Sequence, residues 1–311
     1  MRKKIFITGS SGFVGKNLLN QLQQEQSYSV FALSRTKQSR QGKNIICLQG
    51  DLLAGGNYEK YISTAGAIVH LAGTVNINDS IISPAQTINE RVSLLVRILE
   101  IARKTKKPPL IVFVSTDRVY GKTRKKEVNE EEAPSPIEPY TASKIIGEVL
   151  LETYRLVYGI PYIVLRCDSI YGPHQPKKMF ISDIIQKMLT QTDVAVGDLS
   201  IKKNFVFVDD VARAIILSLQ APQSSYNQIY NIGGKQASLV DLLDIVRHIV
   251  EKRLHKKIVT HFDPALVRKG GIEVNPFRLS TNKARLYLGW KQTVPLEQGL
   301  KKTIEFFTSN K

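Results

Sequence analysis

Short apolar runs, rich in β-branched residues, recur along the first half of the chain and are separated by amphipathic stretches. The runs are Ile5 to Ile7, Val30 to Leu33, Ile45 to Leu48, Ala67 to His70, Leu110 to Val114 and Tyr162 to Leu165. Apolar runs without alternation are typical of strands buried on both faces, as in a parallel sheet. Leucines at helical spacing lie between the runs, for example Leu18, Leu19 and Leu22, and later Leu94, Leu95, Ile98 and Leu99. The pattern predicts an α/β fold with a doubly wound parallel sheet, whose ligand site lies at the carboxyl ends of the strands.

The pattern changes after Arg166, where Pro173 and Pro176 interrupt it. A helix is expected near residues 181–189, and a strand over 205–208 followed by a helix over 211–219 indicates a return to the sheet. We therefore predict a dinucleotide-binding domain made of residues 1–168 plus 204–234. Residues 169–203 plus 235–311 are expected to form a second, smaller α/β lobe that binds the substrate.

Length and composition exclude several classes of protein. The chain has 311 residues, of which 42% are hydrophobic, enough to bury a core in one large or two closely associated domains. Its apolar blocks are far shorter than the roughly 18 residues that a membrane span needs. The two cysteines, Cys47 and Cys167, form no CxxC pair and no cluster with histidine. We therefore expect no disulfide scaffold, no metal site, no membrane contact and a cytoplasmic location.

The chain is strongly basic, with 44 Lys and Arg against 27 Asp and Glu and a net charge of +17. Its lysines lie in scattered runs without interleaved aromatic residues, at 104–107, 122–126 and 252–257. Scattered charge of this kind favours a solvated exterior that attracts phosphorylated ligands. We expect no nucleic-acid partner, because no basic patch with stacking aromatics is present.

A glycine-rich turn follows the first predicted strand directly. It reads Thr8-Gly9-Ser10-Ser11-Gly12-Phe13-Val14-Gly15 and opens a predicted helix. Such glycines let the backbone approach a pyrophosphate, which then accepts hydrogen bonds from free N–H groups at the helix N-terminus. The strand before the turn and the helix after it favour dinucleotide binding over a plain strand-to-helix turn.

Residues at the ends of the next two strands bear on the choice of dinucleotide. The second strand ends in Ser34-Arg35, where an acidic residue would bind the ribose hydroxyls of NAD. A hydroxyl beside an Arg suits a 2′-phosphate better, so the sequence favours NADP over NAD. Asp51, in Gly50-Asp51-Leu52, either accepts hydrogen bonds from the adenine amino group or caps a helix.

Candidate proton-transfer chemistry lies in the segment Tyr140-Thr141-Ala142-Ser143-Lys144. Residues four apart share one face of a helix, so the Lys144 ammonium can lie beside the Tyr140 phenol. A neighbouring cation lowers a phenol pKa that is otherwise about 10, which would make Tyr140 a general acid/base near neutral pH. Ser115 and Thr116 follow the fifth predicted strand directly and place hydroxyls where one of them could hold a substrate oxygen near Tyr140.

These motifs together resemble the extended short-chain dehydrogenase/reductases, and more closely their nucleotide-sugar epimerase/dehydratase group. The resemblance runs in order along nearly the whole chain and rests on the following motifs: the glycine turn, His70-Leu71-Ala72-Gly73, Asn89, Ser115-Thr116 before Val119-Tyr120-Gly121, Tyr140-x-x-x-Lys144, Tyr171-Gly172-Pro173, the segment Val206 to Ala212, Tyr230-Asn231-Ile232-Gly233 and Leu288-Gly289-Trp290.

The resemblance implies a role for each matching residue. Tyr140 would be the acid/base, Lys144 would bind the nicotinamide ribose and lower the Tyr140 pKa, and Thr116 would be the catalytic hydroxyl, with Ser115 as the fallback. The implied cofactor contacts are Gly9, Ser11, Gly12, Phe13, Val14, Gly15, Ser34, Arg35, Asp51, Leu52, Leu71, Ala72 and Gly73. NAD(P) would take a hydride from a sugar carbon while Tyr140 takes the hydroxyl proton. The resulting ketone is then reduced again, loses water or leaves.

Three departures from the family pattern bear on the substrate. Arg118 follows Asp117 where 4,6-dehydratases carry a second carboxylate, which disfavours dehydration. Ser169 replaces an Asn that contacts the substrate diphosphate. Lys203-Asn204 replaces Arg-Asp, so Lys203 can offer only a point charge. The remaining candidate substrate contacts are Ser115, Asp117, Arg268 and Arg278.

Two other features receive structural interpretations. His70, at the end of the fourth strand, is expected to be a packing residue. Asp209-Asp210 is expected to cap the helix near Val211 and to compensate its dipole.

The sequence thus predicts an NAD(P)-dependent epimerase or oxidoreductase that acts on a nucleotide-linked sugar; the resemblance also implies a homodimer. One alternative is a ketone reductase that consumes NADPH. The other is a non-catalytic protein that senses a dinucleotide or associates with nucleic acid, which the intact set of Thr116, Tyr140 and Lys144 disfavours. The sugar, base and stereocentre stay open.

Overall fold

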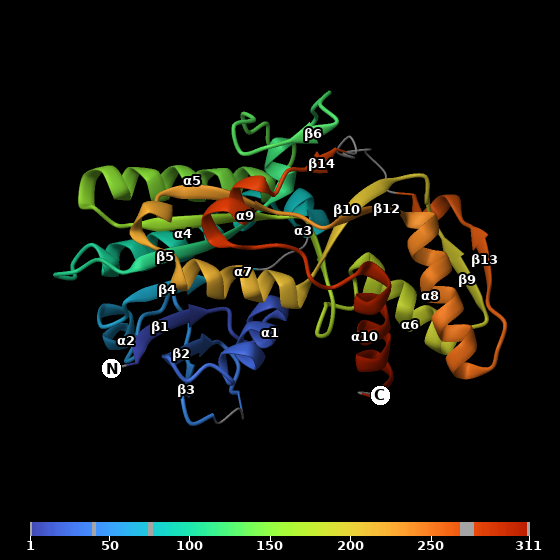
Figure 1. Ribbon diagram of the computed structural model, residues 1–311, viewed down its shortest axis with the longest axis horizontal. Coiled ribbons are helices and arrows are strands. Elements are labelled where there is room, and N and C mark those ends of the chain that lie inside the picture. Colours follow the sequence, from blue (N-terminus) through green and yellow to red (C-terminus); the bar gives the residue numbers. More distant parts are fainter. Residues whose placement is uncertain (1, 39–41, 74–76, 268–276, 310–311) are drawn as a thin grey trace.

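A seven-stranded parallel sheet forms the larger part of the protein (Figure 1). This computed structural model describes residues 2–38, 42–73, 77–267 and 277–309. The strand order is β11-β7-β5-β4-β1-β2-β3, with the bounds β1 Lys3–Thr8, β2 Tyr28–Ser34, β3 Ile45–Gln49, β4 Ala67–His70, β5 Leu110–Thr116, β7 Tyr162–Cys167 and β11 Gln228–Ile232. All six strands predicted from the first half of the sequence are confirmed. The order reverses between β1 and β4, where a doubly wound sheet binds its ligand.

Alternate residues of each strand face two separate cores, as expected for a sheet covered on both sides. Ile5 and Ile7 pack with α1 (Phe13–Leu22) and α7 (Val208–Gln220). Phe6 faces the other side, where it packs with α2 (Glu59–Ser63), α4 (Pro84–Ala102) and α5 (Pro139–Tyr158). Burial on both faces explains why these strands show no polar alternation in the sequence.

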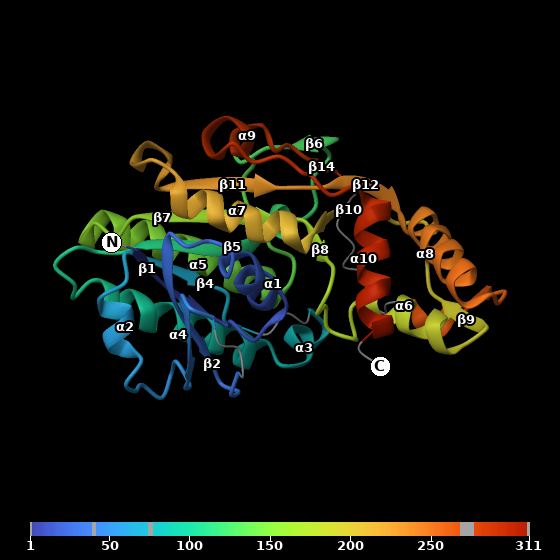
Figure 2. The ribbon, with the colours of Figure 1, turned by 60° about the horizontal axis from the view of Figure 1, so that its bottom comes forward.

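A smaller part lies at one end of the molecule (Figures 1 and 2). It contains β8 Ser169–Tyr171, α6 Phe180–Thr190, β9 Asp193–Val196, β10 Lys202–Phe207, β12 Lys235–Ser238, α8 Leu239–Leu254, β13 Val259–Phe262 and α10 Leu296–Ser309. The three helices share a core of their own, which includes Ile185, Val246 and Leu300. The remaining elements are α3 Ile77–Ile82, β6 Glu127–Val128, β14 Arg278–Leu279, α9 Asn282–Leu288 and the short 3-10 turns Asp117–Tyr120, Gln223–Ser225 and Pro264–Leu266.

The expected return to the main sheet at residues 205–208 is wrong in one respect. Strand β10 pairs with β8 and β12 in a separate three-stranded sheet. The chain returns to the main sheet with α7, which packs on it, and then with β11, which pairs with β7. An apolar strand followed by an amphipathic helix identifies both elements, but their pairing depends on contacts far along the chain.

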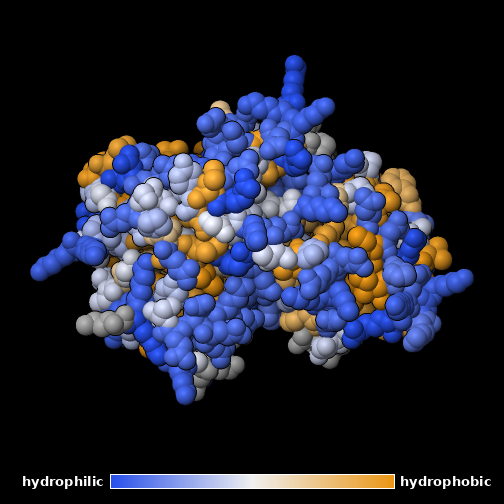
Figure 3. Space-filling view, viewed as in Figure 1, coloured by the Kyte–Doolittle hydropathy of each residue, from blue (hydrophilic) through white to orange (hydrophobic). Residues whose placement is uncertain are grey.

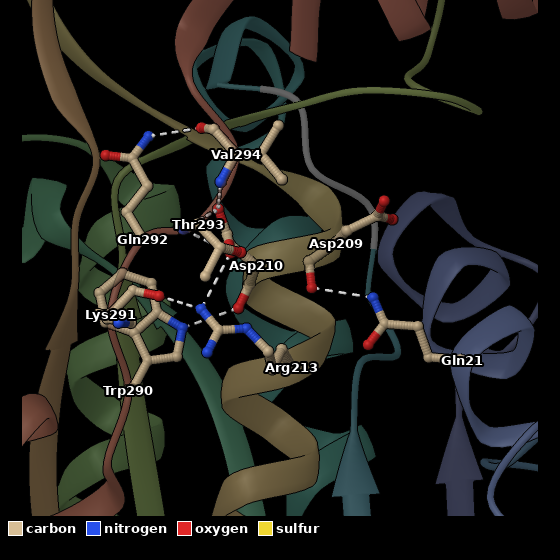
Figure 4. Close-up of polar contacts among 9 residues, drawn as sticks. All are labelled: Gln21, Asp209, Asp210, Arg213, Trp290, Lys291, Gln292, Thr293 and Val294. Atoms are coloured by element: carbon tan, nitrogen blue, oxygen red, sulfur yellow. Dashed lines mark hydrogen bonds and ion pairs between the residues drawn. The ribbon is translucent and has the colours of Figure 1, made fainter. Parts of the chain in front are cut away.

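Asp210 holds the segment before α10 against α7 (Figure 4). Its buried carboxylate accepts hydrogen bonds from the N–H groups of Thr293 and Val294, both at 3.0 Å, and Trp290 donates its indole N–H to the Asp210 carbonyl at 2.8 Å. The N-cap of α7 is Phe207, so the expected capping role of Asp209-Asp210 is wrong, although both acids lie in the first turn, where they oppose the helix dipole. Trp290 itself packs in the core around α7.

The division into a dinucleotide-binding domain of residues 1–168 plus 204–234 and a substrate-binding lobe of residues 169–203 plus 235–311 stays a prediction.

Hydrophilic residues cover most of the face drawn in Figure 3, with smaller apolar patches between them. This agrees with scattered charge spread over the exterior. Within the described part of the chain, no helix combines the length and apolar character that crossing a membrane would require.

Candidate active site

The glycine turn connects β1 to α1 at the point where the strand order reverses. Thr8, the last residue of β1, pairs with Leu33 on one side and His70 on the other. Gly9 has a φ of +68°, and a Cβ there would lie 2.7 Å from the Leu71 carbonyl carbon. A Cβ on Gly15 would lie 2.4 Å from the Gly9 oxygen. Only glycine lets the turn, the helix and the β4 loop approach this closely.

The N-terminus of α1 fits the pyrophosphate of a dinucleotide. Its cap, Gly12, is exposed and extended, no side chain caps the helix, and its first turn, from Phe13, carries no acidic residue. Backbone N–H groups at such an end bind anions. Ser11 and Val14 are half-buried beside them, and Leu71, Ala72 and Gly73 are half-buried on the adjoining β4 loop. The predicted phosphate-binding turn therefore has the local geometry that its role needs.

The end of β2 presents a cation to solvent. Ser34 is buried and donates its hydroxyl to the Thr36 carbonyl. The Arg35 side chain is 68% exposed, and its Nη1 lies 4.0 Å from Glu90 Oε1. An exposed guanidinium at this strand end is accessible to an anion.

Asp51 makes a local turn in the described structure. Its Oδ1 accepts a hydrogen bond from the Leu53 N–H at 2.9 Å, and its side chain is exposed, whereas Leu52 is buried. The adenine contact stays a prediction.

Tyr140 and Lys144 lie in the first turns of α5, under the carboxyl end of β5. Tyr140 is 6% exposed. Lys144 donates its Nζ proton to the Val114 carbonyl at 2.6 Å and lies 4.6 Å from the centre of the Phe113 ring. Burial and the positive charge of Arg91 lower the pKa of Lys144 to about 7.

The balance of charges around Tyr140 differs from the expectation. Burial raises the pKa of the Tyr140 phenol above its usual value, and the largest opposing influence is the cation of Arg91, followed by that of Arg118. The negative charges of Asp117 and Glu138 raise the pKa further. The expected lowering by Lys144 is therefore not the dominant effect in this structure, because the ammonium points to the β5 carbonyl.

Thr116, the last residue of β5, contacts the carboxyl group of the residue that follows it. Its hydroxyl donates to Asp117 Oδ1 at 3.1 Å. Burial raises the pKa of the Asp117 carboxyl and of the Asp168 carboxyl, and the negative charge of Asp117 raises that of Asp168 further.

Asp168 is held by the neighbouring loop. Its Oδ2 accepts the Gly234 N–H at 3.0 Å, and its Oδ1 accepts from Asn204 at 3.3 Å. The positive charge of Lys203 lowers the pKa of Asp117. Asp117, a candidate substrate contact, thus lies beside Thr116, and the charge of Lys203, a second candidate, acts on it.

Ser115 faces the core instead of the site. Its hydroxyl donates to Glu148 Oε1 at 2.6 Å, and Glu148 forms a buried ion pair with Arg166 at 2.6 Å. The Arg166 guanidinium lies 4.8 Å from the centre of the Tyr120 ring. Successive residues of a strand point to opposite faces, so only Thr116 of the two hydroxyl residues is directed to Asp117. The fallback role of Ser115 is not supported.

Arg118 is fixed by Glu138, the N-cap of α5. The guanidinium makes two parallel hydrogen bonds of 2.7 Å to the Glu138 carboxylate, whose side chain is fully buried. This fork geometry holds Arg118 at the site wall. The position where dehydratases carry a second carboxylate is thus filled by a paired cation.

The other candidate substrate residues are dispersed. Ser169 is exposed at the start of β8. Arg278 is exposed on β14 and pairs with Glu127 on β6. Arg268 lies outside the described residues. His70, as expected, is buried: its Nδ1 lies 2.9 Å from the Thr8 hydroxyl, and burial with nearby cations lowers its pKa to about 3. The described residues contain no group of three or more potential metal ligands.

The sequence analysis did not identify three residues that lie at the site: Arg91, Glu138 and Asp168. Arg91 carried a signal, because it lies three and four residues before Leu94 and Leu95 on the apolar stripe of its helix. A charged residue on a buried stripe is unusual. Asp168 similarly follows a buried strand directly. The partner of each depends on distant segments, which the sequence does not reveal.

Comparison with known proteins gives a consistent result. The sequence pattern of the "NAD dependent epimerase/dehydratase family" matches residues 5–233. A Methanocaldococcus jannaschii protein, provisionally assigned as a UDP-glucose 4-epimerase, is 30% identical, and the match covers 98% of this chain and 99% of that protein. The UDP-glucuronate 4-epimerase 5 of Arabidopsis thaliana is 25% identical over 97% of this chain and 75% of its own.

A solved structure extends the similarity to the whole fold. The UDP-glucose 4-epimerase of Thermotoga maritima, solved with UDP-glucose, has a TM-score of 0.84 and 27% identity, and the match covers 99% of each chain. The chain is thus an enzyme of the NAD-dependent epimerase/dehydratase family, whose members include nucleotide-sugar epimerases.

Proposed function

We propose that this enzyme converts a nucleotide-linked sugar through a transient ketone, with Tyr140 as the acid/base. The observation that supports the proposal is the placement of Thr116 at the carboxyl end of β5 and of Tyr140 and Lys144 in the first turns of α5, where Lys144 is bound to a β5 carbonyl. Asp117 and Lys203 add polar groups on the side of the smaller lobe. The activities of the relatives named above, UDP-glucose and UDP-glucuronate epimerisation, support a nucleotide sugar as substrate.

Each residue of the candidate site has a separate role in this reaction. NAD(P), when bound, accepts a hydride from a sugar carbon and can return it. Gly9, Gly12 and Gly15 let the backbone approach the dinucleotide. Tyr140 takes the proton of the hydroxyl on the same carbon and gives it back, while Thr116 orients that oxygen. Lys144 would bind the nicotinamide ribose.

We propose epimerisation rather than reduction by a consumed NADPH, because the relatives named above are 4-epimerases. Arg118, fixed by Glu138, disfavours elimination of water, because it leaves no second carboxylate for that step. An epimerase recovers its dinucleotide in each turnover and retains it, whereas a reductase releases it. Mass spectrometry of the denatured, purified enzyme should find close to one dinucleotide per chain; an empty enzyme that consumes NADPH with a keto sugar would establish the reductase.

We further propose that NADP is preferred, since the exposed Arg35 guanidinium can pair with a 2′-phosphate. In enzyme freed of its bound dinucleotide, NADP(H) should raise the melting temperature more than NAD(H) at equal concentration, and Arg35→Glu should reverse the order, because a carboxylate repels the phosphate and binds ribose hydroxyls. Equal shifts in both proteins would contradict the preference.

A homodimer is also proposed, through α5. This helix exposes an apolar stripe at helical spacing: Ile146, Val149, Leu156 and Val157, of which Leu156 is 67% exposed. A contiguous apolar stripe on a long helix is typical of an interface. Light scattering should give twice the mass of the 34.9 kDa chain, and Leu156→Glu should lower it.

A further inference from the structure

Arg91 is a buried cation that forms no ion pair with an acid among the described residues. It lies on α4 and is 7% exposed, and its Nε and Nη2 atoms have no hydrogen-bond partner among the described residues. Its neighbour Glu90 influences it only at a distance. Removing a guanidinium from water without a paired carboxylate is costly. Packing alone gives no reason for an arginine here, since the surrounding stripe of α4 is apolar.

The guanidinium is directed at the proposed proton-transfer group. Its Cζ lies 4.7 Å from the centre of the Tyr140 ring. On its other side, a Cβ on Gly73 would lie 3.3 Å from its Nη1. Arg91 also lines a small cavity together with His70, Ala72 and Lys144. It therefore lies between the β4 loop, the Tyr140 ring and the Lys144 side chain.

We propose that Arg91 is a positioning residue whose charge stabilises the phenolate form of Tyr140. The inference rests on the proposed role of Tyr140 and adds to it. A cation at the face of a neutral phenol gains a modest attraction, and the gain grows when the ring carries a full negative charge. Arg91 keeps its own proton; only Tyr140 exchanges one with the sugar hydroxyl.

The other charges near Tyr140 explain why such a cation is needed. Asp117, beside Thr116, and Glu138, at the start of α5, both raise the pKa of Tyr140, as does burial. Arg118 lowers it, but its Nε and Nη2 atoms are bound to Glu138. Lys144 has a pKa lowered to about 7 and points to the Val114 carbonyl, so it is only partly charged near neutral pH. An arginine, in contrast, stays charged.

Arg91→Met tests the proposal, because it removes the charge and keeps an unbranched side chain. Turnover near pH 7 should fall on the order of tenfold and recover as the pH rises, since an opposite charge at this range shifts an ionisation by about one unit or more. Arg91→Lys should restore part of the activity at pH 7. Arg91→Met should unfold at the same temperature as the parent or at a higher one, because it loses an unpaired buried charge.

A second readout needs no substrate. The chain has 12 tyrosines, so the ultraviolet absorbance of tyrosinate is titrated in each protein and in the same protein with Tyr140→Phe. The difference reports Tyr140 alone, and its midpoint should move to higher pH in Arg91→Met. Arg97→Met is the matched control: it lies on the same helix, is paired with Glu59, and should leave the midpoint unchanged.

An unchanged midpoint in Arg91→Met would overturn the proposal, and so would a loss of dinucleotide affinity with no change in titration, which would make Arg91 a ligand for the dinucleotide. Failure of the proposed function looks different. If Tyr140→Phe stays active, Tyr140 is not the acid/base, whatever Arg91 does to its titration.

Discussion

Replacing Tyr140 with Phe should lower turnover roughly 10²- to 10⁴-fold, the usual contribution of a positioned acid/base. The ring is 6% exposed and packs against Arg91, and Phe keeps that packing while it removes the hydroxyl. The fold and the dinucleotide affinity should therefore persist, and the loss should appear in kcat more than in KM. Steady-state kinetics on the substrate found for the parent enzyme measure it.

Two further variants separate Tyr140 from its neighbours. Thr116→Val should reduce turnover with little change in its pH dependence, because the hydroxyl orients the substrate oxygen. Lys144→Met should weaken both turnover and dinucleotide binding. Near-parental activity of Tyr140→Phe would contradict the mechanism, whatever the other two variants do.

Glu148→Ala should destabilise the fold by about 3–5 kcal/mol, because it leaves the Arg166 guanidinium buried and unpaired. The side chains of this pair are only 3% and 7% exposed, and Ser115 depends on the same carboxylate. Denaturant unfolding followed by circular dichroism measures the change. Ser115, which is bound to Glu148, precedes Thr116 on β5, so the loss of stability should be accompanied by a loss of activity.

Asp244→Ala provides the control for this prediction. Asp244 pairs with Arg247 on the surface of α8, where the two side chains are 52% and 37% exposed. Exposed pairs contribute less than about 1 kcal/mol. Equal losses for Glu148→Ala and Asp244→Ala would mean that burial does not determine the contribution of the core pair.

The succession of strands and helices along the first half of the chain could be predicted from the sequence, because strands buried on both faces form continuous apolar runs. The glycine turn was equally predictable, since its spacing directly encodes a tight backbone approach. The pairing of β10 with β8 and β12 was not, because an apolar strand carries no sign of which sheet it joins. The roles of Asp210 and Ser115 were missed for the same reason: Asp210 binds residues 293–294, and Ser115 binds Glu148.

The site was predictable at the level of motifs but not of charges. Tyr140, Lys144 and Thr116 could be identified as candidate catalytic residues from the spacing and order of their motifs. The ionisation of Tyr140, however, depends on Arg91, Asp117 and Glu138, which reach it from three segments. Charge effects act through space and change with burial, so a linear motif cannot give their sum.

The most direct test of the proposed function is proton NMR of UDP- and dTDP-linked hexoses incubated with the purified enzyme and no added dinucleotide. The proposal predicts that one of these sugars accumulates as its stereoisomer over many turnovers, that the nucleotide stays attached, and that Tyr140→Phe abolishes the conversion. Conversion of no nucleotide sugar by an enzyme shown to hold its dinucleotide, or equal conversion by Tyr140→Phe, would contradict it.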